Sequence, residues 1–149
     1  GAHIGSWLCG ERYGRNIIMD LNSWTEAWMD WNLLLNERGG PNHAGNMCSA
    51  PVMVDTRNGR LMFQPSYFFI GHFSRYIRPG AEHVACKSDC KGLIATAFVN
   101  VDNVAAVVVM NDSNDDVDFW LVAGLAAAQV SAPARSITTL TVLSSDLYA

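Results

Sequence analysis

Residues 28–32, Trp-Met-Asp-Trp-Asn, carry the chain's most chemically capable group of side chains. The indole of Trp31 offers a broad apolar ring face and one N–H donor, and Asp30 beside it offers a carboxylate acceptor. Asn46, further along the chain, offers a donor and an acceptor in one amide. These groups are suited to binding the hydroxyls and the apolar faces of a ligand.

Each of these residues also has an ordinary structural interpretation. A lone Trp31 is more often part of a core, Asn46 alone would be a turn residue, and a buried acid such as Asp30 often pairs with arginine. His72 is expected to be a hydrogen-bonded structural histidine and not a catalytic acid or base.

The four cysteines, at positions 9, 48, 86 and 90, match no zinc-binding spacing. Cys86 and Cys90 could close a small disulfide loop in a secreted protein, and free thiols are the alternative. Asn111-Asp112-Ser113 is an N-glycosylation sequon, which matters only in a secretory compartment. No metal and no cofactor is expected.

The composition is that of a globular protein, with 50% hydrophobic and 16% charged residues among 149. The formal net charge is -4 and no basic stripe is present, so nucleic acid is not expected as a partner. The longest apolar stretch, residues 119–130, is too short to span a bilayer.

The first half of the chain mixes helical patterns with loops. Apolar residues recur at helical spacing over residues 11–28, which predicts an amphipathic helix. The apolar run 31–35 predicts a strand buried on both faces, and the polar segment 36–50 a long loop after it. Two more elements are expected: a hairpin of residues 51–55 and 60–63, and a helix over residues 65–77.

The second half reads as strands, because short runs rich in Val, Ala and Thr alternate with turn signals. This spacing is typical of part of an antiparallel β-sandwich. Five strands are expected, at residues 83–85, 93–100, 104–110, 117–122 and 137–143.

The order and spacing of several motifs resemble those of the glucosylceramidases of glycoside hydrolase family 30. A Trp-x-Asp-Trp-Asn core followed by Gly-Gly-Pro-Asn is rare by chance, and the match covers most of residues 5–80. The sandwich half matches more loosely. The motifs are Gly5-Ser-Trp7, Arg12-Tyr13, Trp28-Met-Asp-Trp-Asn-Leu-Leu-Leu-Asn36, Gly39-Gly-Pro-Asn42, Gln64-Pro65, Gly71-His-Phe-Ser74 and Ile77-Arg-Pro-Gly80.

The resemblance implies an α/β fold followed by an all-β part. Residues 1–80 would form the last αβ units of a (β/α)8 TIM barrel, and residues 81–149 would supply strands of an antiparallel β-sandwich. Within the barrel, the resemblance places residues 5–28 on the seventh helix, 29–35 on the eighth strand and 65–77 on the last helix.

Active sites of such barrels lie at the C-terminal ends of the strands and in the loops that follow. By resemblance, Trp31 and Asn46 line a glucose-binding pocket. There the indole would stack on the apolar face of the sugar, and the amide would bond to neighbouring hydroxyls. Asp30 is a third substrate-binding residue, which could accept from a sugar hydroxyl or hold a neighbouring arginine.

A retaining glycosidase needs two carboxylates about 5–5.5 Å apart, one as nucleophile and one as acid/base. In the family both are glutamates, near the ends of the fourth and seventh strands, and both are expected upstream of Gly1. No carboxylate of this chain matches either position. We therefore assign no catalytic residue here and expect the chain alone to be inactive.

The sequence thus predicts the C-terminal part of a retaining β-glycosidase that acts on a β-glucoside or a glucosylceramide. Its expected partner is the N-terminal portion of the same enzyme, without which the barrel strand would expose unpaired backbone groups. Peripheral membrane contact through a lipid substrate and a secreted or lysosomal location are further expectations. The alternatives are a non-catalytic carbohydrate-binding or structural module of the same fold and an independent β-rich adhesion domain.

Overall fold

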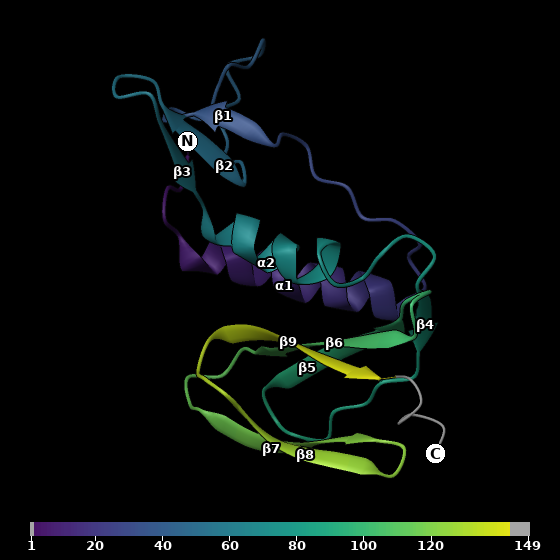
Figure 1. Ribbon diagram of the computed structural model, residues 1–149. Coiled ribbons are helices and arrows are strands. Elements are labelled where there is room, and N and C mark those ends of the chain that lie inside the picture. The colour runs from purple at the N-terminus through teal and green to yellow at the C-terminus, as the bar shows by residue number, and fades with distance from the viewer. Residues whose placement is uncertain (1, 144–149) are drawn as a thin grey trace.

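A computed structural model describes residues 2–143 of the chain. Its elements form layers: a pair of helices packs on one face of a four-stranded sheet, and a β-hairpin covers the opposite face (Figure 1). A small three-stranded sheet lies beyond the helices, at the far end of the molecule from the hairpin (Figure 1).

The first helix, α1 (Trp7–Asn22), ends six residues before the predicted boundary at residue 28. Trp24 adopts a left-handed φ of 67°, and its N–H donates to the Leu21 carbonyl at 3.1 Å. The Thr25 N–H donates to the Asp20 carbonyl, also at 3.1 Å. These two bonds form a Schellman motif, which closes the helix here although the apolar spacing continues beyond it.

The second helix, α2 (Pro65–Ser74), begins where the sequence predicted, with Pro65 in its first turn. It packs against α1 at two glycines of that helix. A Cβ atom at Gly10 would lie 2.6 Å from the Phe69 ring, and one at Gly14 would lie 2.7 Å from it. Phe69 is fully buried, so its ring occupies the space that these glycines leave open.

The three-stranded sheet consists of β1 (Leu34–Asn36), β2 (Val52–Asp55) and β3 (Arg60–Phe63). Strand β1 is parallel to β2, and β2 forms the predicted hairpin with β3. The prediction of a strand over residues 29–35, buried on both faces, is wrong. Pairing begins at Leu34 opposite Val52, and residues 29–32 have no neighbouring strand in the described part of the chain, so no hydrogen-bond ladder forms there.

The four-stranded antiparallel sheet has the order β4-β5-β6-β9, and a separate hairpin joins β7 to β8. Strand β8 was not predicted, because alanine is depleted in strands and its run of alanines gave no β signal. The bounds are β4 (Glu82–Val84), β5 (Leu93–Val99), β6 (Val104–Asn111), β7 (Val117–Ala123), β8 (Ala126–Ala132) and β9 (Ser136–Leu143).

Strand β6 lies at the centre of the molecule and is buried on both faces. Val108 and Met110 belong to one core cluster with α1 and α2. Val107 and Val109 belong to a second cluster, against which Phe119 and Leu121 of the hairpin pack. Successive side chains of a strand point to opposite faces, so β6 forms part of both cores.

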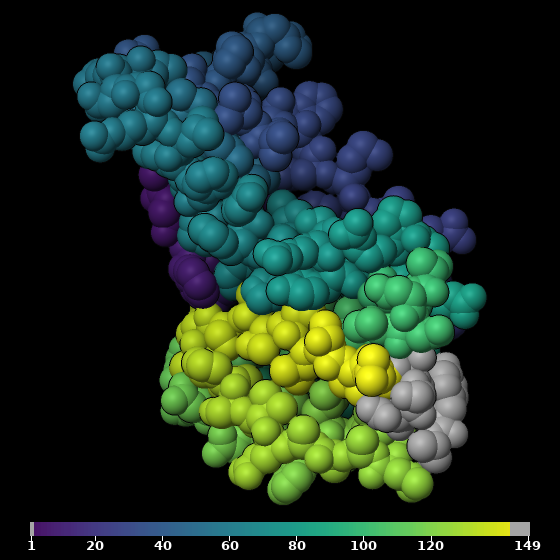
Figure 2. Space-filling view, viewed as in Figure 1, coloured from purple at the N-terminus to yellow at the C-terminus, as the bar shows by residue number. Residues whose placement is uncertain are grey.

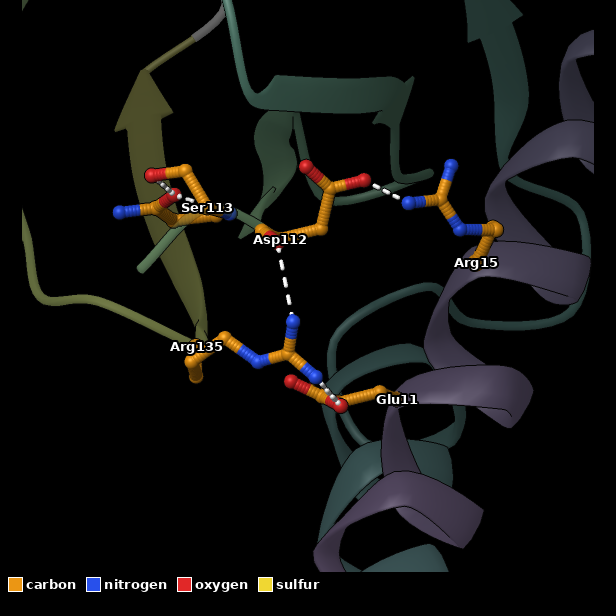
Figure 3. Close-up of polar contacts among 6 residues, drawn as sticks. Glu11, Arg15, Asp112, Ser113 and Arg135 are labelled. Carbon is orange, nitrogen blue, oxygen red and sulfur yellow. Dashed lines mark hydrogen bonds and ion pairs between the residues drawn. The ribbon is translucent and has the colours of Figure 1, made fainter. Parts of the chain in front are cut away.

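Polar contacts also join α1 to the sandwich (Figure 3). Arg135, just before β9, donates to the carboxylate of the buried Glu11 at 2.5 Å and to the Asp112 carbonyl at 3.3 Å. Arg15 pairs with the Asp112 carboxylate, and the Trp7 indole N–H donates to the Arg135 carbonyl at 2.8 Å. The helix is therefore held against the sheet by charge as well as by apolar packing.

The contact between Gly14 and Phe69 generates the first prediction. Replacing Gly14 with alanine should gain about 1 kcal/mol in helix propensity but lose about 1–3 kcal/mol through overpacking, because Phe69 has no room to move. We expect Gly14→Ala to lower the free energy of unfolding of the complete protein, measured by thermal and chemical denaturation. Adding Phe69→Leu should relieve part of the loss, and a Gly14→Ala variant more stable than the parent would contradict the packing.

Candidate functional site

A cleft lies between residues 28–33 and the exposed side of α2, with a volume of about 760 Å³. That volume falls within the range of small-molecule sites. The loop segment contributes Trp28, Asp30, Trp31, Asn32 and Leu33 to the wall. The helix side contributes Tyr67, Phe68, Ile70, Gly71, His72 and Ser74, followed by Arg75 and Tyr76.

Trp31 lies at the surface of this cleft and not in a core. Its side chain is 81% exposed, and the residue lines the cleft next to Asp30 and Asn32. An exposed indole cannot be explained by burial of apolar area within residues 2–143. The arrangement leaves its ring face open to a flat, partly apolar ligand.

Asp30 is held by the tyrosine of α1 and not by an arginine. Its two carboxylate oxygens accept from the Tyr13 hydroxyl at 3.0 and 3.1 Å, and one of them accepts from the Trp31 N–H at 2.8 Å. Burial and the adjacent Asp30 carboxylate raise the pKa of Tyr13 to about 12. The phenol therefore stays protonated and keeps donating, which fixes the backbone at Trp31.

Asn46 lies apart from the cleft. It is exposed in the loop between β1 and β2, and its backbone N–H donates to the Asn42 side chain at 3.1 Å. It is not among the residues that line the cleft. The structure thus brings two of the predicted binding residues together, Asp30 and Trp31, and leaves the third on a neighbouring loop.

Several cleft residues of α2 were missed, because the predicted period placed the wrong face of this helix in the core. Phe69 and Phe73 are buried, whereas Tyr67, assigned to the apolar stripe, lines the cleft. His72 is half-buried, and its Nδ1 lies 2.9 Å from the Thr139 hydroxyl, as expected of a structural histidine. Burial lowers the pKa of His72.

Asp30 is the one carboxylate among the described residues that line the cleft. Glu11 is buried against Arg135, and Glu37 accepts from Thr56 at 3.0–3.1 Å, so neither faces it. Within residues 2–143, no group of His, Cys, Asp and Glu could hold a metal ion, and no helix is long and apolar enough to cross a membrane.

The structure does not support glycosylation of Asn111. This residue is fully buried, and its Nδ2 donates to the carbonyls of Asp115, Ala132 and Pro133 at 2.8, 2.9 and 3.1 Å. A glycan on that nitrogen would displace all of these contacts. The sequon instead forms a turn, in which the Ser113 hydroxyl donates to Asn111 Oδ1 at 2.7 Å.

The predicted disulfide is not formed in the structure, where Cys86 and Cys90 are both free thiols. Both side chains pack as small apolar groups against the core cluster between the sheets. Burial raises the pKa of the Cys86 thiol, which disfavours the reactive thiolate. Their placement is accounted for by packing.

Comparison with known proteins agrees with this architecture. The model of the Glycosyl hydrolase family 30 TIM-barrel domain matches residues 1–77, and that of the Glycosyl hydrolase family 30 beta sandwich domain matches residues 80–140. The chain therefore consists of the end of a TIM barrel followed by a β-sandwich part. It belongs to glycosyl hydrolase family 30.

Individual relatives extend the comparison. The chain is 39% identical over 115 residues to the lysosomal acid glucosylceramidase of Mus musculus, which covers 76% of this chain and 22% of that protein. It is similar to the crystal structure of SrfJ from Salmonella typhimurium, with a TM-score of 0.89, 35% identity, and coverage of 93% of this chain and 31% of that one. An endo-β1,6-glucanase shares the fold, with a TM-score of 0.79 at 24% identity and coverage of 87% and 31%. The chain thus spans less than a third of each of these proteins.

The bond between Tyr13 and Asp30 generates the second prediction. Asp30→Asn removes the charge that helps to raise the Tyr13 pKa, so the pKa should fall from about 12 toward 10, with burial holding it above 10. Alkaline titration of the tyrosinate absorption band, with Tyr13→Phe as the reference, measures this change. A pKa that stays near 12 would show that Asp30 does not act on Tyr13.

The sign of the linked stability follows from the same shift. The folded pKa of Tyr13, about 12, lies above its ordinary value of 10. The stability that it contributes is therefore fully present below the unfolded pKa of about 10 and is lost as the pH rises through the folded pKa.

Proposed function

We propose that this chain is the C-terminal part of a retaining β-glycosidase of the glucosylceramidase type. In this proposal the complete enzyme hydrolyses a β-glucosidic bond through a covalent glycosyl-enzyme intermediate, and both catalytic glutamates lie outside residues 1–149. The observation that carries the proposal is Trp31, an exposed indole on a cleft of sugar-binding size in a chain of glycosyl hydrolase family 30.

Within the proposed site, the residues of this chain bind and orient the sugar. The Trp31 ring stacks on its apolar face, and the indole N–H donates to a hydroxyl. Asp30, held by Tyr13, supports the backbone of Trp31 and offers its remaining acceptor capacity to the sugar. Asn46 approaches from the β1–β2 loop and bonds to a neighbouring hydroxyl.

A single carboxylate on the cleft wall supports the placement of the catalytic pair elsewhere. Retaining hydrolysis needs a nucleophile and a separate acid/base, so Asp30 by itself cannot perform both steps. If an upstream glutamate were missing in the complete protein, the same cleft would serve a non-catalytic carbohydrate-binding module.

The partner that we propose is the N-terminal portion of the same enzyme, which completes the barrel around β1. The barrel part exposes more large apolar side chains than an ordinary surface needs, and a covered interface would explain them. Those along the cleft and the small sheet are Met29, Trp31, Leu33, Leu34, Leu61, Phe63, Tyr67 and Phe68.

The substrate and the location are proposed from the named relative. A glucosylceramide, or another β-glucoside, would be the substrate, and the complete protein would be secreted or lysosomal. A lipid substrate also implies peripheral contact of the enzyme with a membrane.

The third prediction tests the sugar platform. In the complete enzyme, Trp31→Ala should lower kcat/KM for a soluble aryl β-glucoside by about tenfold or more, because stacking area and a hydrogen bond are both lost. Trp31→Phe, which keeps a ring without the N–H, should fall between the parent and the alanine variant.

The matched control is Trp24→Ala, which removes an equally exposed tryptophan outside the cleft. It should leave kcat/KM near that of the parent. Equal losses for Trp24→Ala and Trp31→Ala would remove Trp31 from the site, and an unchanged Trp31→Ala enzyme would do the same.

The fourth prediction tests the partner. Residues 1–149 expressed alone should lack a cooperative thermal transition, whereas co-expression with the upstream portion should give a soluble complex that hydrolyses the aryl β-glucoside. The physical reason is the apolar surface that the upstream portion would cover. A monodisperse monomer of residues 1–149 with a cooperative melt would contradict the proposal.

A further inference from the structure

The β7–β8 hairpin has an unusual composition for an exposed element. No charged residue and no histidine occurs from residue 119 to residue 134. The hairpin lies on the face of the sandwich away from the helices (Figure 1). Its atoms form the lower edge of the molecule, at the far end from the small sheet (Figure 2).

The two faces of the hairpin differ in what they contact. Phe119 and Leu121 point inward and pack against the core cluster between the sheets. Trp120 and Val122 alternate with them and are 64% and 67% exposed. The outward face of β7 is thus apolar although the sandwich core does not use it.

The turn adds a third apolar side chain at the tip. Gly124 has a φ of 60°, and Ala123 pairs with Ala126, so residues 124 and 125 form a two-residue turn. Glycine supplies the left-handed conformation that such a turn needs at its first position. This geometry places Leu125 at the end of the hairpin, where it is 86% exposed.

Polarity rises in steps from the tip. The first three cross-strand pairs are purely apolar: Ala123 with Ala126, Val122 with Ala127, and Leu121 with Ala128. Trp120 then pairs with Gln129, and the first charge appears where Asp118 pairs with Ser131. At about 3.3 Å per residue, Trp120 lies roughly 10 Å from the last pair at the tip.

This sequence of groups follows the depth profile of a membrane surface. Aliphatic side chains are stable in the acyl region, tryptophan is enriched at the level of the headgroups, and charged groups stay in water. We propose that the tip of the β7–β8 hairpin inserts shallowly into the surface of a phospholipid bilayer. The proposal goes beyond the hydrolytic function and does not depend on it.

The open edges of the hairpin limit how deep it can go. Within residues 2–143, β7 and β8 pair only with each other, so each strand has unpaired backbone groups along its outer edge. Such groups cannot enter the hydrocarbon core without a large cost. Insertion therefore stops near the boundary of headgroups and acyl chains, roughly 5–10 Å deep.

The same features favour a bilayer over a sugar or a protein groove. Around Trp120 the polar neighbours lie on one side only, whereas a stacked sugar needs donors and acceptors around its rim. A projecting, charge-free tip offers no directional contact to a protein partner. The chain carries a net charge of -4, so the bilayer that fits is zwitterionic and the binding is insensitive to salt.

The experiment uses the complete enzyme that contains this chain and vesicles of pure phosphatidylcholine. The parent protein should co-float with the vesicles at low and at high salt. Leu125→Glu should reduce the bound fraction by about tenfold or more, because it exchanges an inserted aliphatic group for a charge. The matched control is Val101→Glu, the same kind of change in the 76%-exposed Val101 of the β5–β6 turn, which should bind like the parent.

A second readout reports depth. Phosphatidylcholine brominated on its acyl chains near the headgroup should quench part of the tryptophan fluorescence of the parent protein, and Trp120→Phe should lose that quenchable part. The proposal is overturned if the parent does not co-float, if Leu125→Glu binds as the parent does, or if Trp120→Phe keeps the quenching.

Two further outcomes also count against the proposal. A parent protein that dimerises through the hairpin, with Leu125→Glu monomeric and neither variant bound to vesicles, would assign the surface to a second copy. Activity on the soluble aryl β-glucoside should be equal in the parent, Leu125→Glu and Val101→Glu. This separates a failure of membrane binding from a failure of the glycosidase proposal.

Discussion

The burial of β6 on both faces is the constraint on which the rest of the structure depends. Val108 and Met110 pack against the helices, and Val107 and Val109 pack toward the hairpin, so one strand joins two cores. Apolar side chains on both faces are unusual for an antiparallel strand with one solvated side. Their presence requires a layer on each side of the sheet, and the helices and the hairpin supply those layers.

The position of the cleft follows from that packing through a short series of contacts. Ile17 and Ile18 seat α1 on the β6 side of the sheet, and Arg135 fixes the same helix through Glu11. The Tyr13 hydroxyl of this helix then holds Asp30, the residue next to Trp31. The proposed sugar platform is therefore positioned by the sandwich, although no sandwich residue is among those that line the cleft.

The comparison of prediction and structure shows where local patterns are sufficient. The start of α2 was predicted because Pro65 has a fixed φ and no N–H to lose, and the β2–β3 hairpin was predicted because Asn58-Gly59 suits a tight turn. The end of α1 was missed, since a tryptophan in a left-handed conformation carries no sequence signal. The strand at residues 29–35 shortened to Leu34–Asn36, because its pairing depends on a neighbour that local sequence does not specify.

The sequence by itself determined the family, the order of elements and the grouping of Asp30 with Trp31, because motif spacing and hydrophobic period are properties of the chain. Only the tertiary structure decided that Asn111 is buried, that Tyr13 is the partner of Asp30 and that Phe69 rather than Tyr67 faces the core. These outcomes depend on which residues meet across 17 or more positions of sequence, as in the Tyr13–Asp30 bond. Burial and hydrogen-bond partners are set by that meeting, and no local pattern encodes it.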